Sequence, residues 1–158
     1  MSVVDFSDLT DSPLFNGLAA KEIEFLSGIF AVRQVPEGKT VFVENMPGES
    51  LYMIKAGTVQ ISQMLAETDE QIMIVLGAGD IFGELAVIDG GERASTARIA
   101  EDSLLYVLNR KHFNALAGEK PRLALQLGLN IMRIFTAKMR QAKKDYRTML
   151  MACSGRRK

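Results

Sequence analysis

The sequence has no tryptophan, one histidine and one cysteine among its 158 residues. A single cysteine, Cys153, excludes an internal disulfide framework and fits a reducing compartment. No segment reaches the roughly 18 uninterrupted apolar residues that a membrane-spanning helix needs. The first residues also lack the basic and apolar regions of a secretory signal. The sequence therefore predicts a cytoplasmic protein.

Groups for catalysis or metal binding are equally scarce. His112 lies on a predicted short polar helix, where a solvent-facing or capping role fits it best. No cysteine pair, histidine cluster or Ser/His/Asp combination indicates a metal centre or a nucleophilic mechanism. We therefore expect neither a metal ion nor an enzymatic activity.

The formal net charge is zero, because 19 Lys and Arg residues are balanced by 19 Asp and Glu residues. A neutral chain gives no global indication of nucleic acid or an anionic membrane as a partner. Apolar residues make up 47% of the chain, enough for a buried core in one domain of this length.

The hydrophobic pattern changes between three parts of the chain. Residues 5–28 have roughly helical spacing, with Pro13 suited to a first helical position. Residues 29–108 then break into β-branched and aromatic runs separated by glycine and proline turns. This pattern predicts a mainly β fold, a jelly-roll-like β-roll of about eight strands with flanking helices. The predicted strands are Ile29–Val35, Thr40–Val43, Leu51–Lys55, Thr58–Met64, Gln71–Leu76, Ile81–Phe82, Ser95–Ile99 and Leu104–Leu108.

Helical spacing returns after Leu108. Asn109 is expected to cap a short helix over residues 111–117, and Pro121 to begin a long helix that ends near Ala152. We therefore divide the chain into a roll with its N-terminal helical segment (1–119), the long helix (120–153) and a disordered basic tail (154–158). The first half of the long helix should pack on the roll through Leu123, Leu125, Leu127, Leu129, Ile131 and Ile134.

Further along this helix the apolar residues narrow to a stripe whose steps alternate between four and three residues. That spacing is typical of a coiled-coil seam and predicts a homodimer. The alternative is an amphipathic helix that lies wholly on its own domain. The basic residues on the other faces show no recognition-helix pattern, so direct DNA binding is not expected. The seam residues are Gly128, Met132, Phe135, Met139, Ala142, Tyr146, Met149 and Cys153.

The stretch from Gly79 to Thr96 carries the groups that a sugar phosphate requires. Gly83 opens a short turn, Glu84 follows it, and Arg93 comes nine residues later. A carboxylate can accept hydrogen bonds from sugar hydroxyls, and a guanidinium can bind a phosphate through two donors. Backbone N–H groups of the turn would add an anion-binding nest. The stretch therefore predicts a nucleotide site.

Over about residues 10–150 the chain resembles the cyclic nucleotide-binding domain family. Its members include bacterial catabolite activator-type regulators, regulatory subunits of cAMP-dependent protein kinase, and nucleotide-gated channels. The likeness extends to residues 12–18 before the first helix and to the hairpin over residues 48–59. Its most specific part is Phe82-Gly83-Glu84-Leu85-Ala86 followed by Arg93-Ala94-Ser95.

The resemblance implies that Glu84 accepts a hydrogen bond from the ribose 2′-hydroxyl and that Arg93 pairs with the cyclic phosphate. Backbone amides of residues 83–86 and of Ala94 would complete the phosphate site, with Ser95 as a further donor. Taken singly, Glu84 could be an exposed loop carboxylate and Arg93 part of a surface ion pair. The expected ligand-binding residues are Phe82, Gly83, Glu84, Leu85, Ala86, Arg93, Ala94 and Ser95.

The residue after Arg93 bears on which base the ligand carries. Family members that prefer cGMP often carry threonine there, so Ala94 favours cAMP. Met73 and Ile74 are the expected base contacts from the roll, and Phe135 or Thr136 those from the long helix.

The resemblance also implies a regulatory output. No helix-turn-helix module follows the long helix, so we expect a stand-alone cAMP sensor that signals through its C-terminal helices. The recipient would be the dimer partner or an unidentified protein. Two alternatives stay open. The domain could bind another ligand such as a cyclic dinucleotide, or it could be a dimerisation or docking module in which residues 82–95 bind no ligand.

Overall fold

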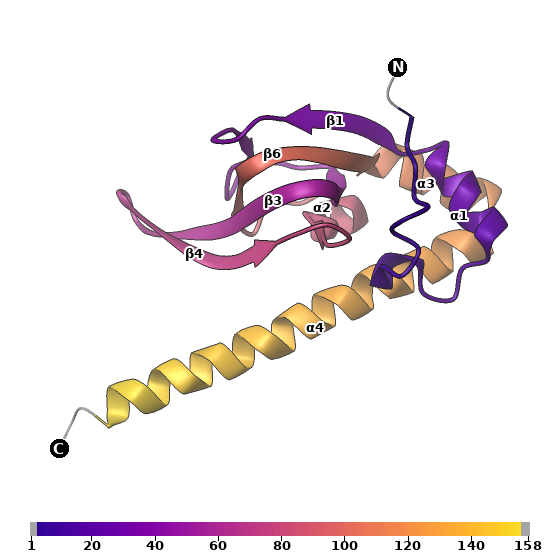
Figure 1. Cartoon of the computed structure of the whole chain (residues 1–158). Coiled ribbons are helices and arrows are strands. Elements are labelled where there is room, and N and C mark those ends of the chain that lie inside the picture. The colour runs from indigo at the N-terminus through magenta and orange to yellow at the C-terminus, as the bar shows by residue number, and fades with distance from the viewer. Residues whose placement is uncertain (1–2, 156–158) are drawn as a thin grey trace.

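The computed structural model describes residues 3–155. The helices are the 3-10 helix η1 (Pro13–Phe15) and the α-helices α1 (Ala20–Ser27), α2 (Glu84–Asp89), α3 (Arg110–Glu119) and α4 (Pro121–Ser154). The strands are β1 (Ala31–Val35), β2 (Thr40–Phe42), β3 (Ser50–Ala66), β4 (Asp69–Leu76), β5 (Ile81–Phe82) and β6 (Thr96–Asn109). Figure 1 shows the strands gathered in one roll, with α1 and α3 at one end and α4 running past it.

The six strands form one antiparallel sheet in the order β1-β6-β3-β4, with β2 paired to β6 and β5 paired to β3. The predicted β-roll with flanking helices is confirmed, but the eight predicted runs are joined into these six strands. Gly57, which was expected to form a turn, has a φ of 99° and lies where the β3–β6 register shifts. An irregularity of this kind bends a strand without ending it, so β3 continues through it.

The roll has apolar side chains on both faces of its central strands. Leu51 and Met53 of β3 belong to a core cluster that includes residues of the flanking helices. Tyr52 and Ile54 point to the opposite side, into a second cluster inside the roll. This alternation follows from the two-residue period of a strand, and it lets one strand join both clusters.

The N-terminal segment differs from the prediction. A helix over residues 5–28 was expected, but residues before η1 are irregular and α1 begins only at Ala20. Local bonds replace a helix there: the Asp5 carboxylate accepts from the Ser7 amide at 2.9 Å, and the Asp5 amide donates to the Tyr106 hydroxyl at 3.0 Å. Gly17, with a φ of 76°, separates η1 from α1. Aspartate and serine favour such local bonds over helix interiors.

The C-terminal helices largely follow the prediction. The Asn109 side chain caps α3 by accepting from the His112 amide at 3.1 Å, and α4 begins at Pro121 and runs for 34 residues. Leu123, Leu127 and Ile131 are buried, whereas Leu125 and Leu129 are exposed. The packing prediction was wrong for these two because leucines two residues apart cannot share one helix face. Ser154 ends α4, and residues 156–158 of the predicted tail lie outside the described part.

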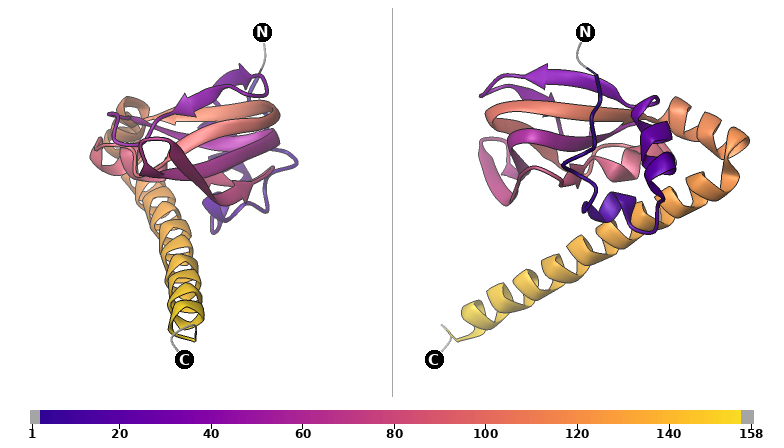
Figure 2. Two further views of the ribbon diagram at one scale, coloured as in Figure 1. Left: turned by 90° about the vertical axis from the view of Figure 1, so that its left-hand side faces the viewer. Right: turned by 45° about the vertical axis from the view of Figure 1, so that its right-hand side comes forward.

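In both views of Figure 2, the ribbon of the C-terminal part of α4 lies apart from the strand ribbons. Four of the predicted seam residues of α4, Met132, Met139, Tyr146 and Met149, are each more than half exposed. Within residues 3–155, no helix has the length and apolar character that crossing a membrane would require.

An ion-pair network ties the β3–β4 hairpin to β6. The Arg98 guanidinium donates to both oxygens of Glu70, at 2.8 and 3.1 Å, and to the Thr40 hydroxyl at 2.7 Å. The buried Ser62 hydroxyl also donates to Glu70. The hydrogen bonds from Arg98 and then from Ser62 hold the pKa of Glu70 below its ordinary value of 4.5.

This network predicts a specific loss of stability in acid. A lowered folded-state pKa gives stability that is present above pH 4.5 and is lost as the pH falls through that folded pKa. Glu70→Gln should therefore weaken the dependence of the unfolding free energy on pH between roughly pH 5 and pH 3. Urea unfolding at several pH values measures this, with Asp69→Asn as the control because Asp69 forms no ion pair in the described part. An unchanged pH dependence in Glu70→Gln would contradict the prediction.

Candidate functional site

A cavity of about 630 Å³ lies between the roll, α2 and α4. All eight residues that were expected to bind ligand line it, from Phe82 to Ala86 and from Arg93 to Ser95. Met73 and Ile74 of β4 and Phe135 of α4 line it as well. Thr136 does not: it is exposed, and its hydroxyl donates to the Met132 carbonyl at 2.7 Å. One position on a helix rotates a side chain by about 100°, which turns Thr136 away from the cavity.

The strand-to-helix turn at Gly83 shapes the polar end of the cavity. Gly83 has a φ of 69°, and it is followed directly by α2. Glycine adopts this left-handed conformation without the strain that a side chain would add. The turn places the Glu84 carboxylate and the Gly83 carbonyl close to Arg93.

Arg93 is buried, with a side chain held by carbonyls and an aromatic ring. Its Nη1 donates to the Ser50 carbonyl at 2.8 Å and to the Gly83 carbonyl at 3.1 Å. Its guanidinium carbon lies 4.1 Å from the centre of the Phe42 ring. Its Nε is buried and has no acceptor among the described residues. Burial lowers the pKa of Arg93, because the charged form loses hydration.

No carboxylate of the described residues forms an ion pair with Arg93. The surface pairing with Glu92 or Asp89 that its sequence position allowed is therefore not found. Asp89 instead accepts from the Gly91 amide at 2.8 Å. A buried cation without a counter-ion is costly, so this geometry favours an anion in the cavity.

Glu84 is also buried, and its partner comes from α4. Its Oε1 accepts from the Lys138 ammonium at 2.9 Å, and Lys138 also donates to the Ile81 carbonyl at 2.8 Å. No hydrogen bond to Oε2 is found within the described part, and Glu84 lines the cavity, so this oxygen is accessible from the cavity. Glu84 is thus no exposed loop carboxylate: one oxygen binds the helix and the other is available.

Lys138 was not among the predicted site residues. Basic residues of the long helix were assigned to solvent-facing sides, and Glu84 lies 54 positions away in the sequence. A signal existed, since Lys138 follows Phe135 by three residues and precedes Ala142 by four, which places all three on one helix face. The other missed lining residues of α4 are Gln141, Ala142, Asp145, Tyr146 and Met149.

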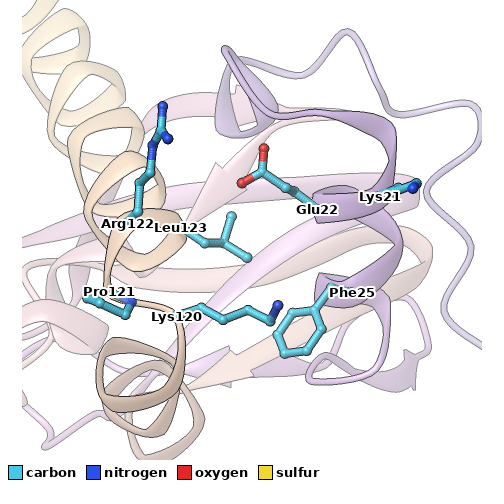
Figure 3. Close-up of a pocket in the computed structure, with 7 residues that line it drawn as sticks. All are labelled: Lys21, Glu22, Phe25, Lys120, Pro121, Arg122 and Leu123. Atoms are coloured by element: carbon cyan, nitrogen blue, oxygen red, sulfur yellow. The ribbon is translucent and has the colours of Figure 1, made fainter.

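A second cavity, of about 360 Å³, lies between α1 and the junction of α3 with α4 (Figure 3). Lys120 extends over the Phe25 ring there, with its Nζ 4.6 Å from the ring centre. Glu22, its only carboxylate, accepts from the Ala19 amide at 2.9 Å. It contains no residue of the 79–96 stretch, so the groups suited to a sugar phosphate line the first cavity and not this one.

The fold and the first cavity together define a class: a β-roll with a nucleotide-type site under a C-terminal helix. Residues 32–120 match the family model described as the cyclic nucleotide-binding domain. This match covers more than half of the chain. The protein belongs to the cyclic nucleotide-binding domain family.

Individual relatives agree with this assignment. The cyclic AMP receptor protein of Thermus thermophilus is 34% identical over 122 residues, which are 77% of this chain and 56% of the relative. The crystal structure of the Thermus thermophilus catabolite activator protein matches with a TM-score of 0.77 and 30% identity, over 87% of this chain and 63% of that one. The regulatory domain of Toxoplasma gondii PKA, co-crystallised with cAMP, matches with a TM-score of 0.61 and 32% identity, over 68% and 41%. The matched part of the chain thus spans a little over half the length of this curated relative.

The Lys138–Glu84 contact predicts how firmly α4 is held. Lys138→Met removes two charge-assisted hydrogen bonds and leaves Glu84 buried without its partner, so amide exchange from residue 135 onward should become roughly tenfold faster. Exchange in residues 121–131, which are anchored by buried leucines, should change little. Hydrogen exchange read by mass spectrometry tests this, with the exposed Lys143→Met as control. Equal exchange in the two variants would show that the contact does not hold the helix.

Proposed function

We propose that this domain binds a cyclic nucleotide, cAMP, in the cavity between the roll and α4. The observation that supports this most is the buried Arg93, which has no carboxylate partner in the described part. A phosphate supplies the missing negative charge, and its oxygens accept from guanidinium donors. The proposal treats residues 1–119 as the binding unit and the helix over 120–153 as its lid and output.

The other proposed contacts follow from the same geometry. Glu84 presents its open oxygen to the ribose 2′-hydroxyl, while the backbone of residues 83–86 and Ala94 surrounds the phosphate. Ser95 lines the cavity and adds a hydroxyl. The base rests on the apolar side chains of Met73, Ile74 and Phe135. The Tyr146 side chain, from the same face of α4, is a further base contact that the cavity lining supports.

Two observations favour cAMP over cGMP. Ala94 follows the arginine and offers no side-chain hydroxyl. The names of two relatives also mention cyclic AMP: one is a receptor protein, and the other was crystallised with cAMP. A cyclic dinucleotide is the second candidate, because the cavity extends well past the polar end towards Met149.

We propose that the domain signals through α4 and is a binding module, not an enzyme. Lys138 links the carboxylate that receives the ribose to the helix that leaves the roll. A ligand on Glu84 changes the environment of this ion pair, and a shift in α4 follows. The single cysteine supports a cytoplasmic location, which stays a prediction.

The exposed stripe on α4 supports a homodimer as the second part of this proposal. Met132, Met139, Tyr146 and Met149 form an exposed apolar seam on α4. Burial of these side chains against a second copy would remove apolar surface from water. A downstream protein could use the same seam, and its identity is open.

The ligand proposal predicts a measurable heat of binding. Titration calorimetry with cAMP, cGMP and cyclic di-GMP should show tightest binding of cAMP. Arg93→Ala should lose affinity by roughly tenfold or more, because it removes charge-assisted hydrogen bonds to the phosphate. The exposed Arg33→Ala, which is outside the cavity, should bind as wild type does.

Each result of this titration bears on one part of the proposal. No heat with any of the three ligands would refute the sensor function. Heat with cyclic di-GMP alone would favour the second candidate ligand. Unchanged cAMP binding in Arg93→Ala would refute the site.

The dimer proposal predicts a doubled molecular mass. Light scattering at micromolar concentration should give about twice the 17.4 kDa of one chain. Met139→Glu places a charge in the seam and should yield monomers, since burial of an unpaired carboxylate is costly. Met151→Glu, at an exposed methionine of α4 on the helix face opposite the seam, is the matched control. A monomeric wild type would refute the dimer and leave the ligand proposal intact.

A further inference from the structure

We propose that the outer side of α4 is a docking surface for an acidic segment of a protein partner. The surface is formed by exposed basic residues that belong to neither cavity and not to the seam. This inference goes beyond nucleotide binding and does not depend on it. We call these residues the basic face of α4: Arg133, Arg140, Lys143, Lys144 and Arg147.

Helix geometry gathers the basic face on one side of α4. Each residue of an α-helix is rotated by about 100° from the one before it, so these five side chains fall within an arc of roughly 100°. The α4 residues that line the first cavity, among them Phe135, Lys138 and Asp145, are centred about half a turn away. The basic face therefore points away from the nucleotide site. It runs for about 21 Å along the helix axis.

The charges of the basic face have no counter-ion among the described residues. None of the ion pairs found there includes a member of this face. Asp145 is the one acidic residue between positions 132 and 155, but it lines the first cavity and accepts from Gln141 Nε2 at 3.0 Å. Arg133 donates to the uncharged side-chain oxygen of Asn130 at 3.3 Å. The basic face therefore keeps its positive charge.

The spacing of the basic residues weakens the helix that carries them. Arg140 precedes Lys143 and Lys144 by three and four residues, and Arg147 follows them by four and three. Residues at these separations are neighbours on a helix surface, and like charges there destabilise the helix. A helix face that only contacts solvent is better stabilised by Glu–Lys pairs at the same separations. An anionic partner would remove the repulsion, so the charge pattern favours a bound helix over a free one.

The composition of the basic face favours a protein over other anionic partners. Its arc otherwise holds Thr136, Met151 and Ser154. It therefore lacks the aromatic and amide side chains that contact nucleic acid bases. One methionine is also too little apolar surface for a helix that inserts into a membrane interface.

The rest of the chain opposes a large polyanion. Residues 1–131 hold ten of the 19 basic residues and 18 of the 19 acidic ones, a net charge of −8. A nucleic acid or an anionic membrane would extend beside the domain as well as the helix and would be repelled by this charge. An acidic segment of a protein is narrow enough to contact α4 alone.

Binding of an acidic peptide to the ligand-free protein tests this surface. The probe is a fluorescent oligoglutamate peptide of about 15 residues, which covers the length of the basic face even as a helix. Its anisotropy should rise with the wild-type protein, and added salt should weaken the binding. Arg140→Glu combined with Lys144→Glu should weaken it by roughly tenfold or more, because two attractions become repulsions. Arg33→Glu combined with Lys39→Glu is the matched control, an equal change of charge at exposed residues outside α4 and both cavities.

NMR locates the binding surface. In isotope-labelled protein the peptide should shift the amide resonances of residues 133–147 and leave those of residues 83–86 in place. Absence of peptide binding would overturn the inference. Equal weakening in the two double variants, or shifts confined to other elements, would overturn it as well.

Three further measurements distinguish other occupants of the basic face. A short DNA duplex and phosphatidylserine–phosphatidylcholine vesicles should bind less tightly than the peptide at about 0.15 M salt. Tighter binding of either would indicate a nucleic acid or a membrane instead of a protein. A lower mass of the Arg140→Glu/Lys144→Glu variant in light scattering would indicate a second copy of this chain. Each of these results would overturn the inference, and none of them depends on whether the protein binds cAMP.

Discussion

The buried guanidinium of Arg93 is the constraint on which the site depends. Its charge is compensated by two carbonyls and an aromatic face, with no carboxylate of the described residues bound to it. Such compensation is incomplete, because a buried cation retains a preference for an opposite charge. The left-handed turn at Gly83 makes room for this arrangement. The roll therefore keeps a positive charge that is only partly compensated, and an anion in the cavity can neutralise it.

The two opposite charges of the cavity are kept from neutralising each other. Glu84 takes its partner from α4, through Lys138, and Arg93 is left to backbone carbonyls. A direct Glu84–Arg93 pair would satisfy both groups and leave neither for a ligand. By dividing the charges this way, the fold keeps Glu84 and Arg93 apart, as the proposed sugar and phosphate contacts require, and it ties Glu84 to α4.

Most of the roll, and the wall of the cavity formed by residues 82–95, could be predicted from sequence because they depend on local patterns. These residues are close together in the sequence, and the glycine at position 83 indicates a turn. The wall formed by α4 depends on how this helix crosses the roll, which no local pattern specifies: Thr136 was expected in the cavity and Lys138 was not. Gly57 was misread for a related reason, since a glycine permits a turn and a bulge alike, and pairing with β6 decides between them.

One face of α4 is required by both parts of the proposed function. Phe135, Ala142, Tyr146 and Met149 belong to the predicted seam and also line the cavity. The charge of this part of the chain is also uneven. Residues 132–158 hold nine of the 19 basic residues and one of the 19 acidic ones, although the net charge of the whole chain is zero. If a ligand and a partner helix contact the same side chains, their binding energies are linked. Linkage is reciprocal, so the factor by which nucleotide changes helix pairing must equal the factor by which pairing changes nucleotide affinity.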